Sequence, residues 1–123
     1  LVALDQITKI YIQTHFMLGE SLEVIRGYFN LTYVQNPGAA FGFLARSPEV
    51  FRDNFFLIIP PLAMILILYF LKTVKDNDHI QILALSRVFG GALGNYIDRL
   101  RVGYVIDFLD FHTQHRYSWP AFN

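Results

Sequence analysis

The polar residues best able to do chemistry lie in one run, residues 90–111. Its sequence, GGALGNYIDRLRVGYVIDFLDF, follows a long apolar stretch and carries Asn95, Asp98, Arg99, Asp107 and Asp110. Polar groups at the end of a membrane-spanning segment are costly to bury and are therefore commonly functional. Gly90 and Gly94 stand one helical turn apart, a spacing that lets a neighbouring helix approach closely. Two interpretations remain open: a catalytic constellation, or packing glycines beside solvated loop charges.

Two carboxyl groups close together could hydrolyse a peptide bond. Like charges a few ångströms apart cannot both ionise, so one pKa rises and the other falls. The ionised partner takes a proton from water, and the protonated partner donates to the carbonyl oxygen. Asp107 and Asp110 are three residues apart, which on an extended strand directs their side chains to opposite faces. A dyad of these two residues therefore needs a bend in the chain.

Histidines near the end of the chain raise the alternative of a metal site. His112 and His115, with Asp110 as a third ligand, form a His-x-x-His pattern, which in a loop is a weak zinc signal. The chain has no Cys, which excludes disulfides, thiol chemistry and Cys-based zinc sites. We expect no metal and no other cofactor.

The composition favours a membrane protein. Hydrophobic residues make up 54% of the chain and charged residues 16%, with a positive mean hydropathy of 0.35. The formal net charge is zero, which argues against a nucleic-acid partner.

Apolar helices must position these polar residues. Residues 55–71, FFLIIPPLAMILILYFL, carry no charge and are long enough to span a bilayer. Pro60 and Pro61 either lie inside this span, where neighbouring helices can satisfy the freed backbone groups, or in its first turn. The alternative is the buried core helix of a soluble protein.

Two further spans are weaker. Residues 80–97 are interrupted by Gln81, Ser86 and Arg87, and residues 1–16 resemble the last part of another span. Asp5 and Lys9 lie four residues apart within the latter, so they can pair on one helix face.

The connector of residues 19–45 mixes aromatic and β-branched residues with turn formers. It predicts one or two short strands that end at a turn at Asn36-Pro37-Gly38, and residues 102–108 are again strand-like. Ser47-Pro48-Glu49 is typical of a helix start.

Two consecutive spans return the chain to the membrane face from which it started, so the segments that carry the motifs share one face. The two spans joined by residues 72–79 bring the connector and the tail after residue 99 to one membrane face. Charge does not give the orientation, because only Lys72 and Lys75 lie in the short loop, whereas the other face would hold Arg26, Arg46, Arg52, Arg99, Arg101 and Arg116.

Several long motifs resemble one family. GGALGNYIDR, GYVIDFLDF and WPAFN, with DQITK at residues 5–9 and NPGAAFG at residues 36–42, occur in the order found in signal peptidase II, the lipoprotein signal peptidases. These are integral-membrane aspartic proteases of bacteria, and the resemblance covers nearly the whole chain.

The resemblance implies an all-α integral-membrane helical bundle with a small extended β platform on one membrane face. Of the family's four spans, residues 1–123 would hold about three: part of the first, the second and the third. They would form a single membrane-embedded peptidase domain that lacks the start of the first helix and the last helix.

The resemblance also implies the site residues. Asp107 matches the first catalytic aspartate, and the second would follow Asn123 by three residues, so the 123-residue chain is expected to be inactive. The supporting or substrate-binding residues would be Asp5, Lys9, Asn36, Gly38, Asn95, Arg99 and Asn123. Packing or capping remains an alternative role for each of these. Asp98 is expected to be structural, paired with a basic neighbour.

The implied reaction removes the signal peptide from diacylglyceryl-modified prolipoproteins at the bacterial inner membrane. The enzyme would be a multi-pass protein, with its site near the periplasmic face and with prolipoprotein and membrane lipid as its partners. The rival hypothesis is a non-catalytic helix-packing or adaptor protein. Arg87 departs from the family pattern, which is apolar in this stretch.

Overall fold

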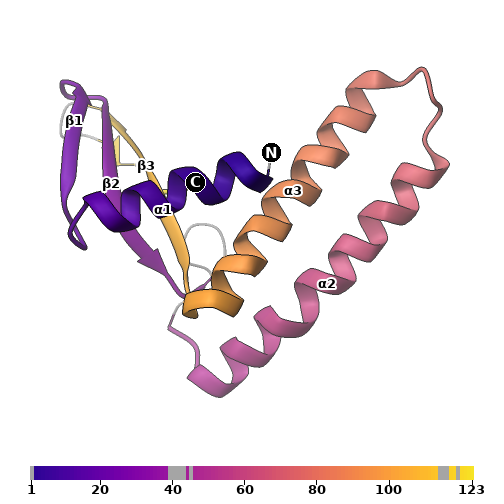
Figure 1. Cartoon of the computed structure of the whole chain (residues 1–123), viewed down its shortest axis with the longest axis horizontal. Coiled ribbons are helices and arrows are strands. Elements are labelled where there is room, and N and C mark those ends of the chain that lie inside the picture. The colour runs from indigo at the N-terminus through magenta and orange to yellow at the C-terminus, as the bar shows by residue number, and fades with distance from the viewer. Residues whose placement is uncertain (1, 39–43, 45, 114–116, 119) are drawn as a thin grey trace.

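The computed structural model describes residues 2–38, 44, 46–113, 117–118 and 120–123. Its elements are α1 (Val2–His15), β1 (Ser21–Ile25), β2 (Phe29–Asn36), α2 (Glu49–Thr73), α3 (His79–Val102), β3 (Val105–Thr113) and β4 (Tyr117–Ser118). Helices α2 and α3 run side by side as an antiparallel hairpin, and α1 lies between α3 and the sheet (Figure 1).

Helix α2 is continuous over 25 residues, from Glu49, directly after Pro48, to Thr73. Pro60 and Pro61 lie in its interior, so the first-turn alternative is wrong. Among the described residues, α2 is the helix long and apolar enough to cross a membrane, with a mean hydropathy of 2.3 in its most apolar window. Only 11% of that window is buried within the protein, whereas the core helix of a soluble protein would be mostly buried.

Helix α3 is longer than the expected span of residues 80–97. Asp78 caps it by accepting a hydrogen bond from Gln81 N (3.2 Å). Gly103 ends it in the left-handed conformation (φ 85°), where glycine carries no steric penalty. The expected strand at residues 102–108 therefore begins later, at Val105, because Val102 still belongs to the helix. Arg87 lies on an exposed part of α3.

Helix α1 packs on α3 through glycine. Gly90 and Gly94 are both buried, and Gly94 lies on the face of α3 that meets α1. A Cβ atom added at Gly94 would collide with the Asp5 carboxylate, so this close approach requires glycine.

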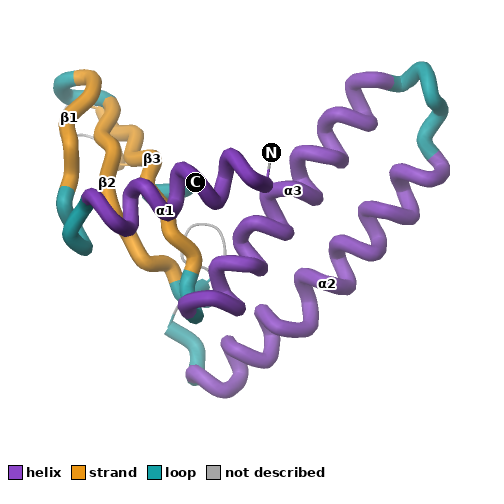
Figure 2. The backbone as a smooth tube through the Cα atoms, in the orientation of Figure 1, coloured by secondary structure: helices purple, strands orange, loops and turns teal. Residues whose placement is uncertain are grey.

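The sheet is larger than the small platform expected, so the description all-α is incomplete. Its order is β1-β2-β3-β4, all antiparallel, and β2 and β3 have eight and nine residues. The period-two pattern of short segments underestimates strand length because pairing with a distant segment extends each strand. The sheet gathers at one end of the molecule, away from the loop that joins α2 to α3 (Figure 2).

The core lies between α1 and the sheet. Ile12, Tyr33 and Ile106 are buried there, with Phe16 and Phe108 packed against them.

Strand β2 contains a bulge: its pairing with β3 shifts by one residue between Leu31 and Val34.

Candidate active site

Asp107 lies on β3 with its side chain almost fully enclosed, at 5% exposure. Asn36 Nδ2 donates to its Oδ2 (3.1 Å), and Asn123 Nδ2 donates to its Oδ1 (3.0 Å). Burial raises the pKa of Asp107 to about 6, while the two amides and the nearby cations Lys9 and Arg99 oppose that rise. A carboxyl group with this pKa is well placed to give or take a proton near neutral pH.

Asn36 is held by the turn that follows β2. Its Oδ1 accepts a hydrogen bond from Gly38 N (2.9 Å), a common way for asparagine to fix a turn. Gly38 O in turn accepts a hydrogen bond from Arg99 Nη2 (2.7 Å), which ties the turn to α3. Three of the residues expected at the site are thus joined in one chain of contacts. Residues 39–42 of the NPGAAFG motif lie outside the described residues.

Phe122 is tied to β3 by backbone hydrogen bonds. Leu109 N donates to Phe122 O (2.6 Å), and Phe122 N donates to Leu109 O (3.0 Å). This pairing places the Asn123 amide between Asp107, Asn95 Oδ1 (3.0 Å) and the Ile106 carbonyl (3.3 Å). Asn123 therefore connects the strand that carries Asp107 to helix α3.

Lys9 is completely buried, and its ammonium group has three acceptors. These are Asp98 Oδ2 (2.8 Å), Asn95 Oδ1 (2.8 Å) and Asp5 Oδ2 (3.0 Å). The expected pairing of Asp5 with Lys9 on one helix face is confirmed. All three ammonium protons have a partner, as a buried charge requires.

Asp98 carries no exposed surface and is the basic-paired structural residue that was expected. Besides Lys9, it accepts hydrogen bonds from Ile106 N (3.2 Å) and Gln6 Nε2 (3.1 Å). Its bond to Ile106 N fixes the backbone next to Asp107. The sequence reasoning missed Gln6, which also lies 3.1 Å from Gly94 O, although its place in the DQITK motif was the available signal.

Arg99 joins α3 to α2 as well as to the Gly38 turn. Its guanidinium lies 4.2 Å from the centroid of the buried Phe56 ring, a cation–π contact that the sequence reasoning did not anticipate. Within the described part of the chain, Arg99 Nε is buried without a hydrogen-bond partner.

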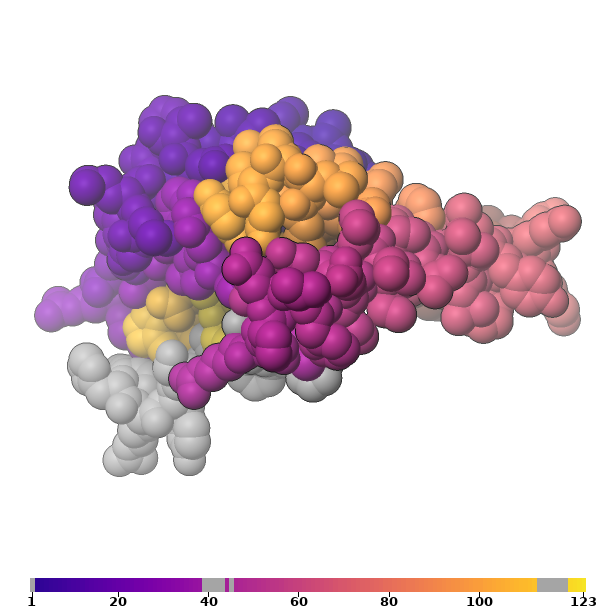
Figure 3. All heavy atoms as spheres, turned by 90° about the horizontal axis from the view of Figure 1, so that it is seen from below, coloured from indigo at the N-terminus to yellow at the C-terminus, as the bar shows by residue number. Residues whose placement is uncertain are grey.

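A cavity of about 450 Å³ opens beside Arg99. It lies between the start of α2 and the end of α3, the two segments that meet in Figure 3. Its charged lining residues are Glu49, Arg52, Asp53 and Arg99, and Pro37 of the Asn36 turn also lines it.

The alternative residues lie elsewhere. Asp110 is paired with Asn30, three strand positions from Asp107, and the extra residue of the bulge is on β2, so alternation along β3 is kept. His112 pairs with Ser118, and His115 lies outside the described residues. Among the residues that the structure describes, no three acidic or histidine side chains gather as a metal site.

Known proteins resemble this chain over its whole length. The model of the family described as signal peptidase (SPase) II matches residues 1–123. The lipoprotein signal peptidase of Syntrophus aciditrophicus is 52% identical over 120 residues, which cover 98% of this chain and 74% of the relative. That of Desulforapulum autotrophicum is 47% identical over 124 residues, covering 100% and 75%.

Two solved structures of bacterial membrane enzymes share the fold. One, determined by the in meso method at 2.3 Å resolution, has a TM-score of 0.82 and 41% identity over 99% of this chain and 71% of its own. A second, at 1.9 Å, has a TM-score of 0.73 and 39% identity, covering 96% and 74%. With a family model that matches every residue and relatives of this similarity, the chain belongs to the signal peptidase II family.

Proposed function

We propose that this chain removes the signal peptide from lipoprotein precursors, with Asp107 as one carboxyl group of an aspartic dyad. Family membership gives the reaction class, cleavage of prolipoprotein signal peptides, and makes the chain an aspartic-type enzyme. It also decides against the non-catalytic adaptor. The observation that supports Asp107 is its enclosed carboxyl group, held by two amides and poised with a pKa of about 6.

The amides would set the geometry of the reaction. Asn36 and Asn123 each occupy one oxygen of Asp107, so the carboxyl plane is fixed before substrate arrives. In the proposed mechanism a second carboxyl group shares a proton with Asp107, and one of the pair activates water while the other protonates the scissile carbonyl oxygen. We propose that the second aspartate stands three residues after Asn123, as the family motif implies.

The remaining site residues would support this pair. Lys9 and Asp5 brace Asn95, which shares the Asn123 amide with Asp107. Arg99 would face the substrate beside the Gly38 turn, since its guanidinium is directed to that turn.

A lipid-modified substrate suits this location. The proposed substrate carries a diacylglyceryl cysteine, so its acyl chains can stay in the bilayer while the peptide bond reaches Asp107. Helix α2 is membrane-length, and the candidate site lies at the end of the α2–α3 hairpin opposite its connecting loop. We propose a multi-pass protein of the inner membrane, folded as a single peptidase domain, with this end toward the periplasm.

The test is cleavage of a lipidated prolipoprotein by the protein that is expressed from the complete gene encoding this chain. Asp107→Asn should lower kcat by at least about 10²- to 10⁴-fold, the usual contribution of a general acid or base, without unfolding the protein. Asp110→Asn on the same strand is the matched control and should retain most activity. Full activity of Asp107→Asn would reject the assignment.

A further inference from the structure

We propose that the cavity between the start of α2 and the end of α3 receives the polypeptide that follows the scissile bond in the substrate. This inference rests on the proposed peptidase function and specifies which part of the substrate this cavity holds.

The lining of the cavity favours an occupant with both polar and apolar groups. Four charged side chains line it, two of each sign: Glu49, Arg52, Asp53 and Arg99. Apolar side chains, among them Phe56 and Leu57, complete the lining. An acyl chain or an apolar signal segment would take water from the charged groups without replacing its hydrogen bonds, at a cost of several kcal/mol. A peptide supplies both donors and acceptors, and about 450 Å³ falls within the range of sites that hold small ligands or a few residues.

The cavity begins where the candidate site ends. Pro37 lines it, and the neighbouring Asn36 donates to Asp107 Oδ2. Arg99 of α3 also lines it and donates to Gly38 O. The cavity would therefore lie next to a peptide bond held at Asp107, because Pro37 directly follows the Asn36 that contacts this carboxyl group.

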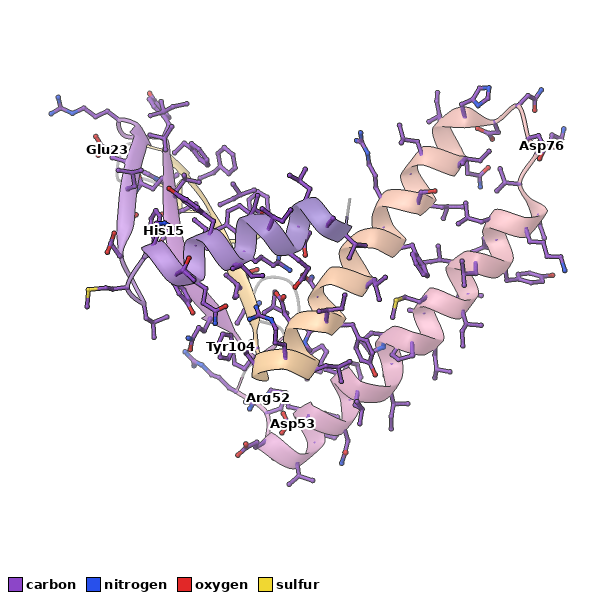
Figure 4. All side chains as sticks on the ribbon, in the orientation of Figure 1. His15, Glu23, Arg52, Asp53, Asp76 and Tyr104 are labelled. Carbon is purple, nitrogen blue, oxygen red and sulfur yellow. The ribbon has the colours of Figure 1, made fainter. Side chains whose placement is uncertain are left out.

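The position along α2 places this cavity at the end of the apolar stretch. Its charged residues on this helix, Glu49, Arg52 and Asp53, lie in the first turns, before the uncharged residues 55–71, of which Phe56 and Leu57 reach the cavity. Figure 4 shows Arg52 and Asp53 on these turns, beside the end of α3. The signal segment and the acyl chains of the substrate are apolar and remain in lipid, whereas the chain after the cysteine continues into water. That part supplies the hydrogen-bonding groups that the charged lining residues can bind.

Arg52 and Asp53 offer opposite charges to the occupant. Arg52 Nε lies 3.8 Å from Asp53 Oδ1, and the Arg52 side chain is the more enclosed, at 19% exposure against 60%. Substrate residues just after the cysteine would thus meet a cation within the cavity and an acid at its rim.

The experiment compares three lipidated precursors that differ only in the three residues after the cysteine: all Ser, all Asp or all Lys. The protein encoded by the complete gene is assayed with Arg52→Glu, and with Lys75→Glu as a control that makes the same charge change in the α2–α3 loop. Relative to the Ser substrate, Arg52→Glu should lower kcat/KM for the Asp substrate about two- to fivefold and raise it similarly for the Lys substrate. Lys75→Glu should change none of the three.

A second measurement does not depend on Arg52→Glu folding. A benzophenone group placed three residues after the cysteine, in a substrate left uncut by Asp107→Asn, should crosslink to residues 49–57 or 96–103. Crosslinks confined to β1 or to residues 74–78 would overturn the inference, as would unchanged preferences in a folded Arg52→Glu. If the unmodified protein cleaves none of the substrates, the proposed function itself fails and this inference with it.

Discussion

Lys9 and Asp98 form an ion pair of 2.8 Å although 89 positions separate them, and neither side chain has any exposed surface. The pair joins α1 to the end of α3, next to the strand that carries Asp107. A buried charge without its partner is far more costly than an exposed one, so this contact should dominate the stability of the site.

Lys9→Met should lower the free energy of unfolding by about 3–5 kcal/mol, because it leaves the Asp98 carboxylate buried without a cation. Asp53→Asn, which breaks the exposed pair with Arg52, should cost less than about 1 kcal/mol. Denaturation in detergent micelles measures both. Equal effects of the two substitutions would show that the buried pair has no special weight.

Asp107→Asn should change how stability depends on pH. The pKa of Asp107 rises from 3.8 to about 6 on folding, so the wild-type contribution is fully present below pH 3.8 and is lost as pH rises through 6. The variant cannot ionise, so its stability relative to wild type should increase between pH 4 and pH 7.5, by up to about 3 kcal/mol. Urea titrations at the two pH values measure this, and a constant difference would contradict it.

Gly94→Ala should destabilise the α1–α3 contact by about 1–3 kcal/mol, because the new methyl group meets the Asp5 carboxylate. Gly91→Ala is a matched control on the same helix. Its methyl group would meet nothing within 4 Å, and alanine favours a helix over glycine by up to about 1 kcal/mol. Thermal unfolding of both variants gives the comparison, and a Gly94→Ala protein as stable as Gly91→Ala would refute the packing argument.

Single cysteines should report the two faces of the membrane, since the chain has no cysteine of its own. Glu23 on β1 and Asp76 in the α2–α3 loop lie at opposite ends of the molecule (Figure 4). Glu23→Cys and Asp53→Cys should react with an impermeant maleimide from one side of the membrane, and Asp76→Cys only from the other. Labelling of all three from one side would exclude the spanning arrangement.

The family motifs implied that Asp107, Asn36 and Asn123 belong to one site, and the count of spans placed their segments on one face of the membrane. The Asp5–Lys9 pair was also predictable, since a four-residue spacing acts within one helix. For Asp98, the sequence predicted a basic partner but did not identify it as Lys9. Periodicity identifies a polar position on a helix face but does not say which other helix that face meets.

Other contacts gave no local signal. The stacking of Arg99 on Phe56 depends on how α2 and α3 cross, which is set by packing along both helices. Strand β3 was expected to end at residue 108. Pairing with the distant strand β2 extends it to Phe111, and pairing with β4 extends it to Thr113. Pro60 and Pro61 were left open because a proline inside a span depends on neighbouring groups.

The bulge in β2 determines whether Asn36 can reach the carboxyl group. Thr32 and Tyr33 are buried in succession, so the faces of the strand exchange at this point. With uninterrupted pairing from Leu31, Asn36 would fall on the face opposite Asp107. The length of this segment is therefore as strictly constrained as its chemistry. Deletion of a single residue there would leave every motif intact, but the strand could then no longer both bury its core side chains and direct Asn36 to Asp107.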